Sequence, residues 1–336
     1  MKKIAFIGFW DNFNPETMPL TKYIREFTDV EITDVKHADY VFFSVQSEKH
    51  WFASDDSIKI FYTGENLTPD FNACDYAIGF DWMEYGDRYM RLPLYYLYKD
   101  ICEQSERKHL LNPEAVAKEK TGFCSITVSN SRRNPIFQTL FEELSKYKKV
   151  DSGGRWNNNI GGPVADKQAF DASHKFSIVC ENSAHPGYTT EKLVQAFAAN
   201  CIPIYWGDPE VARVFNTRAF INVPDYSSVE EVADIVRRID TDEQYYHAML
   251  REPVFNDEEY YKARQIEKLK EFLSYIFSQP KEKACRRNRE FYGLKYVKDH
   301  RTMARATSNI FFNDYRHKVA VSLYYKFRNL IKRDKP

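Results

Sequence analysis

The sequence predicts an α/β protein with two Rossmann-like domains, and three observations support this prediction. Short apolar runs alternate with helix-periodic segments in the first third of the chain, and the alternation resumes after residue 122. The length of 336 residues gives room for two domains, each with its own core. Residues 176–207 have the pattern of a strand, a loop, a helix and a second strand, which is the unit that builds parallel sheets.

The first domain is expected over residues 1–115. Its strands are predicted at Ile4–Gly8, Val30–Thr33, Tyr40–Phe43, Ile58–Thr63 and Tyr76–Gly79, with a helix at Pro19–Glu26. Gly8 follows the first strand, but the second and third glycines of a GxGxxG loop are absent, so a dinucleotide site is not predicted. Residues 99–121 are polar and charged, and we interpret them as a linker or surface excursion between domains.

The second domain is expected over residues 120–300 and opens with a strand at Gly122–Val128. Further elements are a helix near Pro135–Lys146, a strand near Val150, a strand at Phe220–Val223, a helix at Ser228–Ile239 capped by Ser227 or Ser228, and a long helix within residues 257–277. This order again predicts a sheet with helical crossovers.

The strand-loop-helix-strand unit is the most informative part of the second domain. Phe176–Cys180 and Cys201–Trp206 are its apolar strands, and Asn200 ends the helix between them. Thr189 and Thr190 lie at the helix N-cap, directly before Glu191 and Lys192. A helix N-terminus at the carboxyl edge of a parallel sheet attracts anions, and Lys192 adds a full positive charge there. The unit therefore predicts a binding site for a negatively charged ligand.

The chain end, residues 315–336, predicts a basic amphipathic helix. Apolar residues gather on one face of its helical wheel and basic residues spread over the others; the apolar set is Ala320, Leu323, Tyr324, Phe327 and Ile331. Two interpretations stay open: contact with an anionic membrane surface, or docking on the chain's own domain.

Composition excludes several classes of protein. The 48 basic and 48 acidic residues balance, so bulk charge gives no case for nucleic acid as a partner. Six scattered cysteines without CxxC spacing indicate free thiols in a reducing compartment. The start of the chain fits a first strand better than a signal peptide, and no run is long enough to span a membrane. We therefore expect a cytoplasmic protein, with the membrane's inner face as an alternative location.

Metal sites are not predicted. The eight histidines form no metal-ligand spacing. Asp240-Thr241-Asp242 has the D-x-D pattern, but it follows a predicted helix, so we interpret it as an exposed acidic turn.

Glu65 is the candidate catalytic group of the first domain. It lies just past the carboxyl end of an apolar strand, beside Gly64, and catalytic groups collect in loops at such strand ends. From its position alone, Glu65 can be interpreted either as a solvated loop carboxylate or as a catalytic carboxylate.

Three segments carry a resemblance to a known family. They are HKFSIVCENSAHPGYTTEK at residues 174–192, IPIYWG at 202–207, and FYTGENLTPDFNACDYAIGFD with RYMRLPLYY between 61 and 96. Together they resemble the α-1,3/4-fucosyltransferases, with most similarity to bacterial members that build Lewis-type antigens. The resemblance covers about residues 58 to 250.

This resemblance implies a GT-B fold, with two Rossmann-like domains facing a cleft, and transfer of L-fucose from GDP-β-L-fucose with inversion. It implies an acceptor-binding first domain and a donor-binding second domain. The residues implied to contact the donor are Asn130, Asn182, Tyr188, Glu191, Lys192 and Gly207. Glu191 would accept hydrogen bonds from ribose hydroxyls, Lys192 would offset diphosphate charge, and Glu65 would be the general base. No metal is required, and stimulation by a divalent cation stays open.

The chain departs from the family pattern at one position. Related proteins carry an arginine where this chain has Phe137, and Arg132 or Arg133 could supply the guanidinium–phosphate contact instead. Two solvated loop arginines are the alternative. The heptad repeats of some bacterial relatives are absent, which puts any oligomer built through them in doubt.

The expected function is therefore transfer of fucose to the 3-OH of GlcNAc in a Galβ1-4GlcNAc glycan or lipopolysaccharide. Two alternatives are kept: a GT-B transferase for another GDP-sugar such as GDP-mannose, and a non-catalytic glycan- or nucleotide-binding protein. The sequence leaves open the linkage (1,3 or also 1,4), the physiological acceptor and the oligomeric state.

Overall fold

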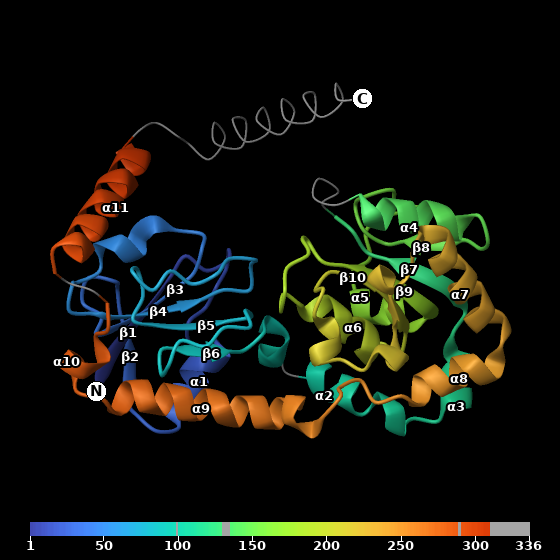
Figure 1. Ribbon diagram of the computed structural model, residues 1–336, viewed down its shortest axis with the longest axis horizontal. Coiled ribbons are helices and arrows are strands. Elements are labelled where there is room, and N and C mark those ends of the chain that lie inside the picture. The colour runs from blue at the N-terminus through green and yellow to red at the C-terminus, as the bar shows by residue number, and fades with distance from the viewer. Residues whose placement is uncertain (99, 130–134, 288–289, 310–336) are drawn as a thin grey trace.

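The computed structural model describes residues 1–98, 100–129, 135–287 and 290–309, with side chains described up to residue 305. Two α/β domains lie side by side, each built on a parallel sheet (Figure 1). The predictions for Asn130, Arg132, Arg133 and the tail at 315–336 concern residues outside the described part of the chain.

Within the described residues, the first sheet has six parallel strands in the order β2-β1-β3-β4-β5-β6. They are β1 (Lys2–Ile7), β2 (Val30–Ile32), β3 (Tyr40–Phe43), β4 (Ile58–Tyr62), β5 (Tyr76–Gly79) and β6 (Tyr89–Arg91). Every residue of β3, β4 and β5 is buried, as expected for parallel strands that are covered on both faces. The short strand β6 was not predicted.

The second sheet has five parallel strands among the described residues, in the order β11-β10-β9-β7-β8. They are β7 (Gly122–Ile126), β8 (Val150–Ser152), β9 (His174–Cys180), β10 (Ile202–Trp206) and β11 (Ile221–Asn222). All five were predicted within a few residues of their ends.

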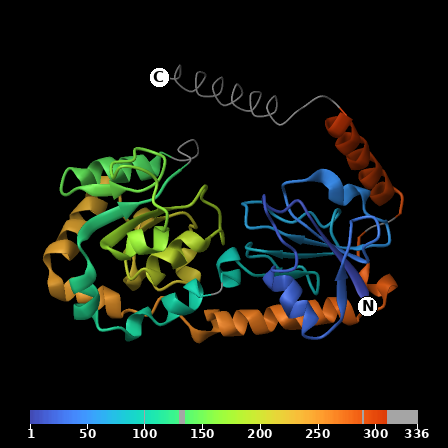
Figure 2. The ribbon, with the colours of Figure 1, turned by 180° about the vertical axis from the view of Figure 1, so that it is seen from behind.

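Helices cover the faces of both sheets (Figures 1 and 2). They are α1 (Pro19–Arg25), α2 (Ile101–Glu106), α3 (Pro113–Glu119), α4 (Ile136–Ser145), α5 (Lys167–Ala172), α6 (Glu191–Ala198), α7 (Val229–Thr241), α8 (Glu243–Arg251), α9 (Lys262–Ser278), α10 (Lys281–Ala284) and α11 (Tyr292–Asn309). Asn200 has a φ of +56°, the left-handed conformation that ends α6 as predicted. Ser228 caps α7 through its hydroxyl.

The segment expected to be a linker or surface excursion between domains, residues 99–121, is helical and partly buried in its described part, from residue 100 on. Helices α2 and α3 lie there, and Cys102 and Lys108 are buried. The Lys108 ammonium donates to the carbonyl oxygens of Met249 and Leu250, at 3.2 and 3.1 Å. A segment rich in charge can pack in this way because a long side chain buries its stem and places its head on backbone acceptors.

The chain returns to the first domain after α8. Helix α9 packs beside α1, and its apolar residues Leu269, Leu273, Ile276 and Phe277 join the core of the first sheet. Figure 1 shows α11 beside the same domain. Residues 262–287 and 290–305 therefore pack with the first domain, whereas the sequence assigns residues up to 300 to the second domain.

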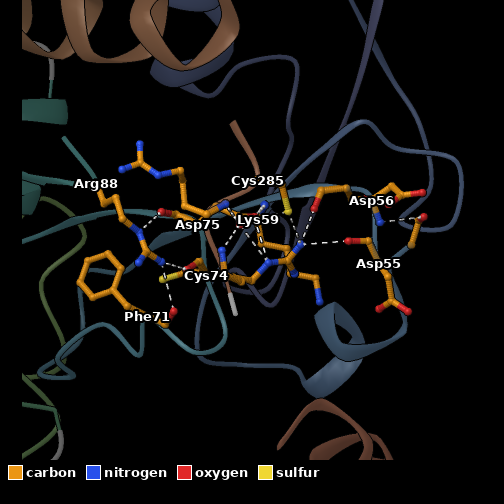
Figure 3. Close-up of polar contacts among 12 residues, drawn as sticks. Asp55, Asp56, Lys59, Phe71, Cys74, Asp75, Arg88 and Cys285 are labelled. Carbon is orange, nitrogen blue, oxygen red and sulfur yellow. Dashed lines mark hydrogen bonds and ion pairs between the residues drawn. The ribbon is translucent and has the colours of Figure 1, made fainter. Parts of the chain in front are cut away.

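A buried ion pair fastens the returning segment to the amino ends of β4 and β5 (Figure 3). Asp75, which is fully buried, accepts hydrogen bonds from the backbone N–H groups of Lys59, Arg286 and Arg287. The Arg287 Nε also donates to it at 3.1 Å, and the Cys285 thiol lies 3.4 Å away. We call Asp75, Arg287, Cys285 and Lys59 the Asp75 cluster.

The interpretation of Asp240-Thr241-Asp242 as an exposed turn is wrong for Asp240. Its side chain is 2% exposed and pairs with Lys148 at 2.5 Å and Lys175 at 2.9 Å. Asp242 caps α8 through the N–H of Tyr245. Both carboxylates have structural partners, and Lys175 lies near the amino end of β9, away from the edge where ligands bind in such sheets.

All six cysteines lie in the described part of the chain, and none of them forms a disulfide bond. Among the described helices, none has the length and apolarity needed to cross a bilayer. In the same residues, no group of three or more histidine, cysteine, aspartate or glutamate side chains is arranged to hold a metal ion.

Candidate active site

Each sheet has a topological switch point, and a cavity lies at both. In the first sheet β2 and β3 lie on opposite sides of β1, and in the second β8 and β9 lie on opposite sides of β7. Parallel sheets bind ligands at the carboxyl ends of strands at such points. The loops after β1 and β3 line one cavity, of about 280 Å³, and the loops after β7 and β9 line another, of about 360 Å³. We call them the central cavity and the second-domain cavity.

The two cavities meet at the start of α6. Asn182, Glu191 and Lys192 line both of them. The central cavity also contains Glu65 from the first domain and Tyr188 from the second. The structure thus brings together, across the two domains, five residues that the sequence singled out.

Glu181, which sequence reasoning missed, organises the start of α6. Its carboxylate accepts the Thr190 N–H and the Thr190 hydroxyl, both at 2.7 Å. Thr190 is the N-cap residue, but its hydroxyl makes no capping bond because it is directed to Glu181. The signal in the sequence was an acidic residue directly after the buried strand β9.

Gly207 makes room for Glu181. A Cβ atom on Gly207 would lie 2.4 Å from the Glu181 Cγ, so a larger residue would displace that side chain. The sequence predicted that Gly207 binds the donor. In the structure Gly207 lies against the side chain of Glu181, whose carboxylate binds the N-cap residue of α6.

The Lys192 ammonium lies close to oxygen atoms of three side chains. Its ammonium lies 2.9 Å from the Thr190 hydroxyl, 3.2 Å from Glu181 and 3.6 Å from Glu191. Burial lowers the pKa of a lysine, but Glu181 and Glu191 outweigh it here and raise the pKa of Lys192 above its ordinary value. Burial raises the pKa of Glu181, with Lys192 acting against that shift. Because 29% of the Lys192 side chain is exposed, its charge remains available to a ligand.

The loop that precedes α6 packs against the first domain through Gly187 and Tyr188. Gly187 has a φ of +84°, and a Cβ there would lie 2.4 Å from the Phe80 carbonyl oxygen. The Tyr188 ring packs edge-on against Phe80 with centroids 4.9 Å apart. Asp208 fixes the loop from the other side by accepting the Gly187 N–H and the Thr189 hydroxyl.

Further contacts join the domains around the central cavity. The Asn66 amide donates to the Ser183 hydroxyl at 2.6 Å, and His185 lies 3.0 Å from Asp81. The Trp82 ring lies between the guanidinium groups of Arg91 and Arg213, each 3.7 Å from the ring centroid. A cation over an aromatic ring is attracted by the ring's negative face.

Glu65 lies in an exposed loop directly after β4. Its N–H donates to the Thr63 hydroxyl at 3.0 Å, which fixes the turn. A Cβ on the neighbouring Gly64 would lie 2.5 Å from the Leu94 Cδ2, so the Leu94 side chain would have to shift to make room for it. The loop therefore holds the carboxylate at the wall of the central cavity.

The second-domain cavity contains Phe137, the position of the departure from the family pattern. Its ring is buried and packs edge-on against Trp156, with centroids 4.8 Å apart. Lys167 lines the same cavity and pairs with the buried Asp171 at 2.5 Å. Sequence reasoning missed Lys167 because nothing in the local pattern marks it.

Two parallel α/β sheets, with a cavity lined by loops of both domains, match the GT-B architecture of glycosyltransferases. Two family models match the chain: the Alpha-(1,3)-fucosyltransferase FucT N-terminal domain over residues 4–98, and the Glycosyltransferase family 10 (fucosyltransferase) C-terminal domain over residues 117–290. The chain belongs to glycosyltransferase family 10, the fucosyltransferases, as the resemblance implied.

Relatives and solved structures agree with this family. The chain is 35% identical to the Alpha-(1,3)-fucosyltransferase FucT of Helicobacter pylori, over 59% of this chain and 47% of that protein. It thus spans about half the length of this curated relative. A crystal structure of an α1,3-fucosyltransferase matches with a TM-score of 0.71 and 26% identity, over 86% of this chain and 93% of the other. The structure of an α1,3-fucosyltransferase with GDP-fucose matches with a TM-score of 0.67 and 27% identity, over 81% and 90%.

Proposed function

We propose that the protein is an α-1,3-fucosyltransferase that transfers L-fucose from GDP-fucose to an acceptor glycan. One observation carries the proposal: a carboxylate of the first domain, Glu65, lines the same cavity as Lys192 and the N-terminus of α6. A base for the acceptor and a cationic site for the leaving group therefore share one space.

The donor occupies the start of α6 in this proposal. Its diphosphate lies beside Lys192 and the first turn of the helix, and its nucleoside extends into the second-domain cavity. Asn182 and Glu191 lie where the two cavities meet, so Glu191 is placed to accept hydrogen bonds from ribose hydroxyls. The solved relative with GDP-fucose supports this donor.

The chemistry is a single displacement with inversion at the anomeric carbon. The bond from fucose C1 to the diphosphate oxygen breaks, and a bond from C1 to the acceptor oxygen forms. Glu65 takes the proton from that acceptor hydroxyl. Negative charge grows on the departing diphosphate, and Lys192 stabilises it more in the transition state than in the ground state.

The proposed acceptor is the 3-OH of GlcNAc in a Galβ1-4GlcNAc unit, on a free glycan or on lipopolysaccharide. We also propose that protein groups hold the diphosphate without a required metal. The helix N-terminus and the charged Lys192 support this part of the proposal. Transfer rates measured with and without a chelator check it, and a rate that depends strictly on added divalent ion would contradict it.

Glu65→Gln tests the proposal, because it keeps the shape of the side chain and removes its ability to take a proton. We expect turnover to fall by roughly 10²–10⁴-fold, while calorimetry shows unchanged affinity for GDP. Glu84→Gln, at an exposed position of the same domain, is the control and should keep full activity. Retained turnover in Glu65→Gln would remove Glu65 from the mechanism.

A donor panel tests the choice of sugar. GDP-fucose and GDP-mannose are offered with the same acceptor, and the product's linkage is read by NMR. Faster transfer from GDP-mannose would favour the alternative transferase, and binding of both without transfer would favour a non-catalytic protein.

A further inference from the structure

Residues 182–190, which we call the donor loop, connect β9 to α6 and form part of the proposed donor site. Tyr188 and Thr190 of this loop line the central cavity. The second domain fixes the loop through Glu181 and Asp208, whose carboxylates accept its N–H and hydroxyl groups. The first domain contacts the same loop from the other side, so both domains contribute to its conformation.

Gly187 is the position where the donor loop most depends on outside contacts. Its φ is +84°, which glycine adopts at no steric cost, but glycine also has the most conformations to lose when it is fixed. The chain alone therefore does not select this conformation. The contacts of the Gly187 N–H and carbonyl groups select it.

Arg91, the last residue of β6, reaches the donor loop from the first domain. Its Nη2 donates to the Gly187 carbonyl oxygen at 3.4 Å, and its Nε donates to the Phe80 carbonyl oxygen at 2.9 Å. One guanidinium therefore joins a loop of the first domain to the donor loop. At 3.4 Å the contact with Gly187 is long, so it depends on what else fixes the guanidinium.

The Trp82 ring fixes that guanidinium. The Arg91 guanidinium carbon lies 3.7 Å from the ring centroid, and that of Arg213, from the second domain, lies at the same distance. Each cation is attracted by the ring's negative face. Because one arginine of each domain stacks on the same ring, the arrangement exists only while the two domains are docked.

The charge of Arg91 also supports Asp208. Asp208 is 2% exposed, and burial raises the pKa of its carboxyl. The hydrogen bonds that Asp208 accepts, together with the positive charge of Arg91, act against that shift and favour the ionised form. Since the Asp208 carboxylate accepts the Gly187 N–H, Arg91 supports Gly187 twice: directly at its carbonyl oxygen, and through Asp208 at its N–H.

Arg88, three residues earlier, makes contacts of the same kind inside the first domain alone. Its Nε donates to the Asp75 carbonyl oxygen at 2.8 Å, and its Nη2 donates to the carbonyl oxygens of Phe71 and Cys74 at 3.1 and 2.8 Å (Figure 3). Its guanidinium lies over the rings of Phe71 and Tyr85. Arg88 thus matches Arg91 in chemistry but does not touch the donor loop.

We propose that Arg91 is a positioning residue for the donor. It holds the donor loop in its binding conformation from the first domain, so the donor site is complete only while the domains are docked. This inference rests on the proposed function, which gives the loop its ligand. Arg91 acts through the loop, since it lines neither of the two cavities that the donor is proposed to occupy.

Hydrogen–deuterium exchange of the protein without ligand tests the proposal in Arg91→Met and Arg88→Met. We expect the Gly187 and Thr190 amides to exchange roughly 10-fold faster in Arg91→Met, because the loop leaves its hydrogen bonds with Asp208 and Glu181 more often. In Arg88→Met these amides should exchange as in the parent protein.

Calorimetry of GDP binding and donor kinetics give the second readout. In Arg91→Met the affinity for GDP should fall about 10-fold and the KM of GDP-fucose should rise to match, with little change in kcat, because the binding conformation is populated in about a tenth of the molecules. In Arg88→Met the GDP affinity should stay within about twofold, since the loop population is unchanged.

Two further variants separate positioning from charge and from a folding defect. Arg91→Lys keeps the charge but loses the planar fork that stacks and donates, so it should resemble Arg91→Met. Arg213→Met removes the other arm of the Trp82 stack from a side chain that is 51% exposed, where a loss of folding is not expected. It should change exchange and GDP affinity in the same direction, by about threefold.

Two results would overturn the proposal. Unchanged exchange of the donor loop in both Arg91→Met and Arg213→Met would show that the first domain does not hold it. Parent-like GDP affinity in Arg91→Lys would show that Arg91 acts by charge alone. The exchange readout is independent of the reaction. Faster exchange in Arg91→Met of a protein that transfers no fucose would keep the positioning role and reject the transferase, whereas a parent protein that transfers fucose, with unchanged exchange in its variants, would do the reverse.

Discussion

Among the ion pairs with a buried carboxylate in the described part of the chain, the Asp75–Arg287 pair lies at the amino edge of the first sheet and the Glu181–Lys192 pair at the carboxyl edge of the second. In the Asp75 cluster, Asp75 is fully buried and the Arg287 side chain is 6% exposed, so both charges are enclosed by the chain. In the pair at α6, Glu181 is equally buried, but 29% of the Lys192 side chain is exposed and it lines two cavities. We therefore propose that the Glu181–Lys192 pair, which opens onto two cavities, binds the ligand, and that the enclosed Asp75–Arg287 pair has a structural role only.

The pKa values of two lysines, Lys59 in the Asp75 cluster and Lys192 in the pair at α6, show the same contrast. Burial lowers the pKa of Lys59 to about 7, and the positive charges of Arg287 and Arg301 act in the same direction. Lys192 also lies in a buried setting, yet Glu181 and Glu191 raise its pKa. The sign of the neighbouring charges therefore decides which buried lysine keeps its charge at neutral pH.

The largest expected loss of activity comes from Lys192→Met, which removes the partly exposed positive charge at the start of α6. We expect the transfer rate to fall on the order of 10³-fold, because the leaving diphosphate loses its cation. Affinity for GDP, measured by calorimetry, should fall by about 10- to 100-fold. Lys59→Met makes the same replacement at the enclosed cluster and should leave both quantities within about twofold. Equal losses of transfer rate and GDP affinity in the two variants would contradict the difference in role between Lys192 and Lys59.

Asp75→Asn tests the enclosed pair. The unfolding free energy should fall by about 3 kcal/mol, since Arg287 loses its buried counter-charge. Denaturant titration measures this change, and activity at a temperature where the variant is folded should match that of the parent protein. Asp39→Asn is the matched control: its pair with Lys281 ties the same returning segment but is exposed, so the cost should stay below about 1 kcal/mol. A cost at Asp75 no larger than at Asp39 would contradict the assigned role.

The smallest expected effect is a pH dependence from Lys59. Its pKa is about 7 in the folded protein and 10.5 ordinarily, so between these values the unfolded chain binds a proton that the folded protein lacks. The unfolding free energy of the parent protein should therefore rise with pH across that window. Lys59→Met should lack this rise, which denaturant titrations at pH 7 and pH 9.5 can measure. Parallel pH profiles for the two proteins would mean that Lys59 keeps an ordinary pKa.

The local elements of the fold could be predicted well from the sequence. Strands β3 and β5 have the predicted ends, Tyr40–Phe43 and Tyr76–Gly79, because a fully buried run bounded by polar residues has one interpretation. The return of α9 to the first domain could not be predicted. The apolar face of α9 must pack against one of the two domains, but the sequence pattern does not show which. The Asp75–Arg287 pair ties the segment after α9 to the first domain, and it joins residues 212 positions apart in the sequence.

The candidate site was predictable in part for the same reason. The gathering of Glu65 with Asn182, Tyr188, Glu191 and Lys192 follows from loops at the carboxyl ends of two sheets. Glu181 was missed because its role depends on contacts with Thr190 and Lys192 that only the folded turn creates.

A crystal structure of the protein soaked with GDP tests the central claim most directly. We expect the diphosphate within hydrogen-bond distance of the Lys192 ammonium at the first turn of α6, and the nucleoside in the second-domain cavity. GDP bound elsewhere, with Lys192 still directed only to Glu181 and Thr190, would contradict it.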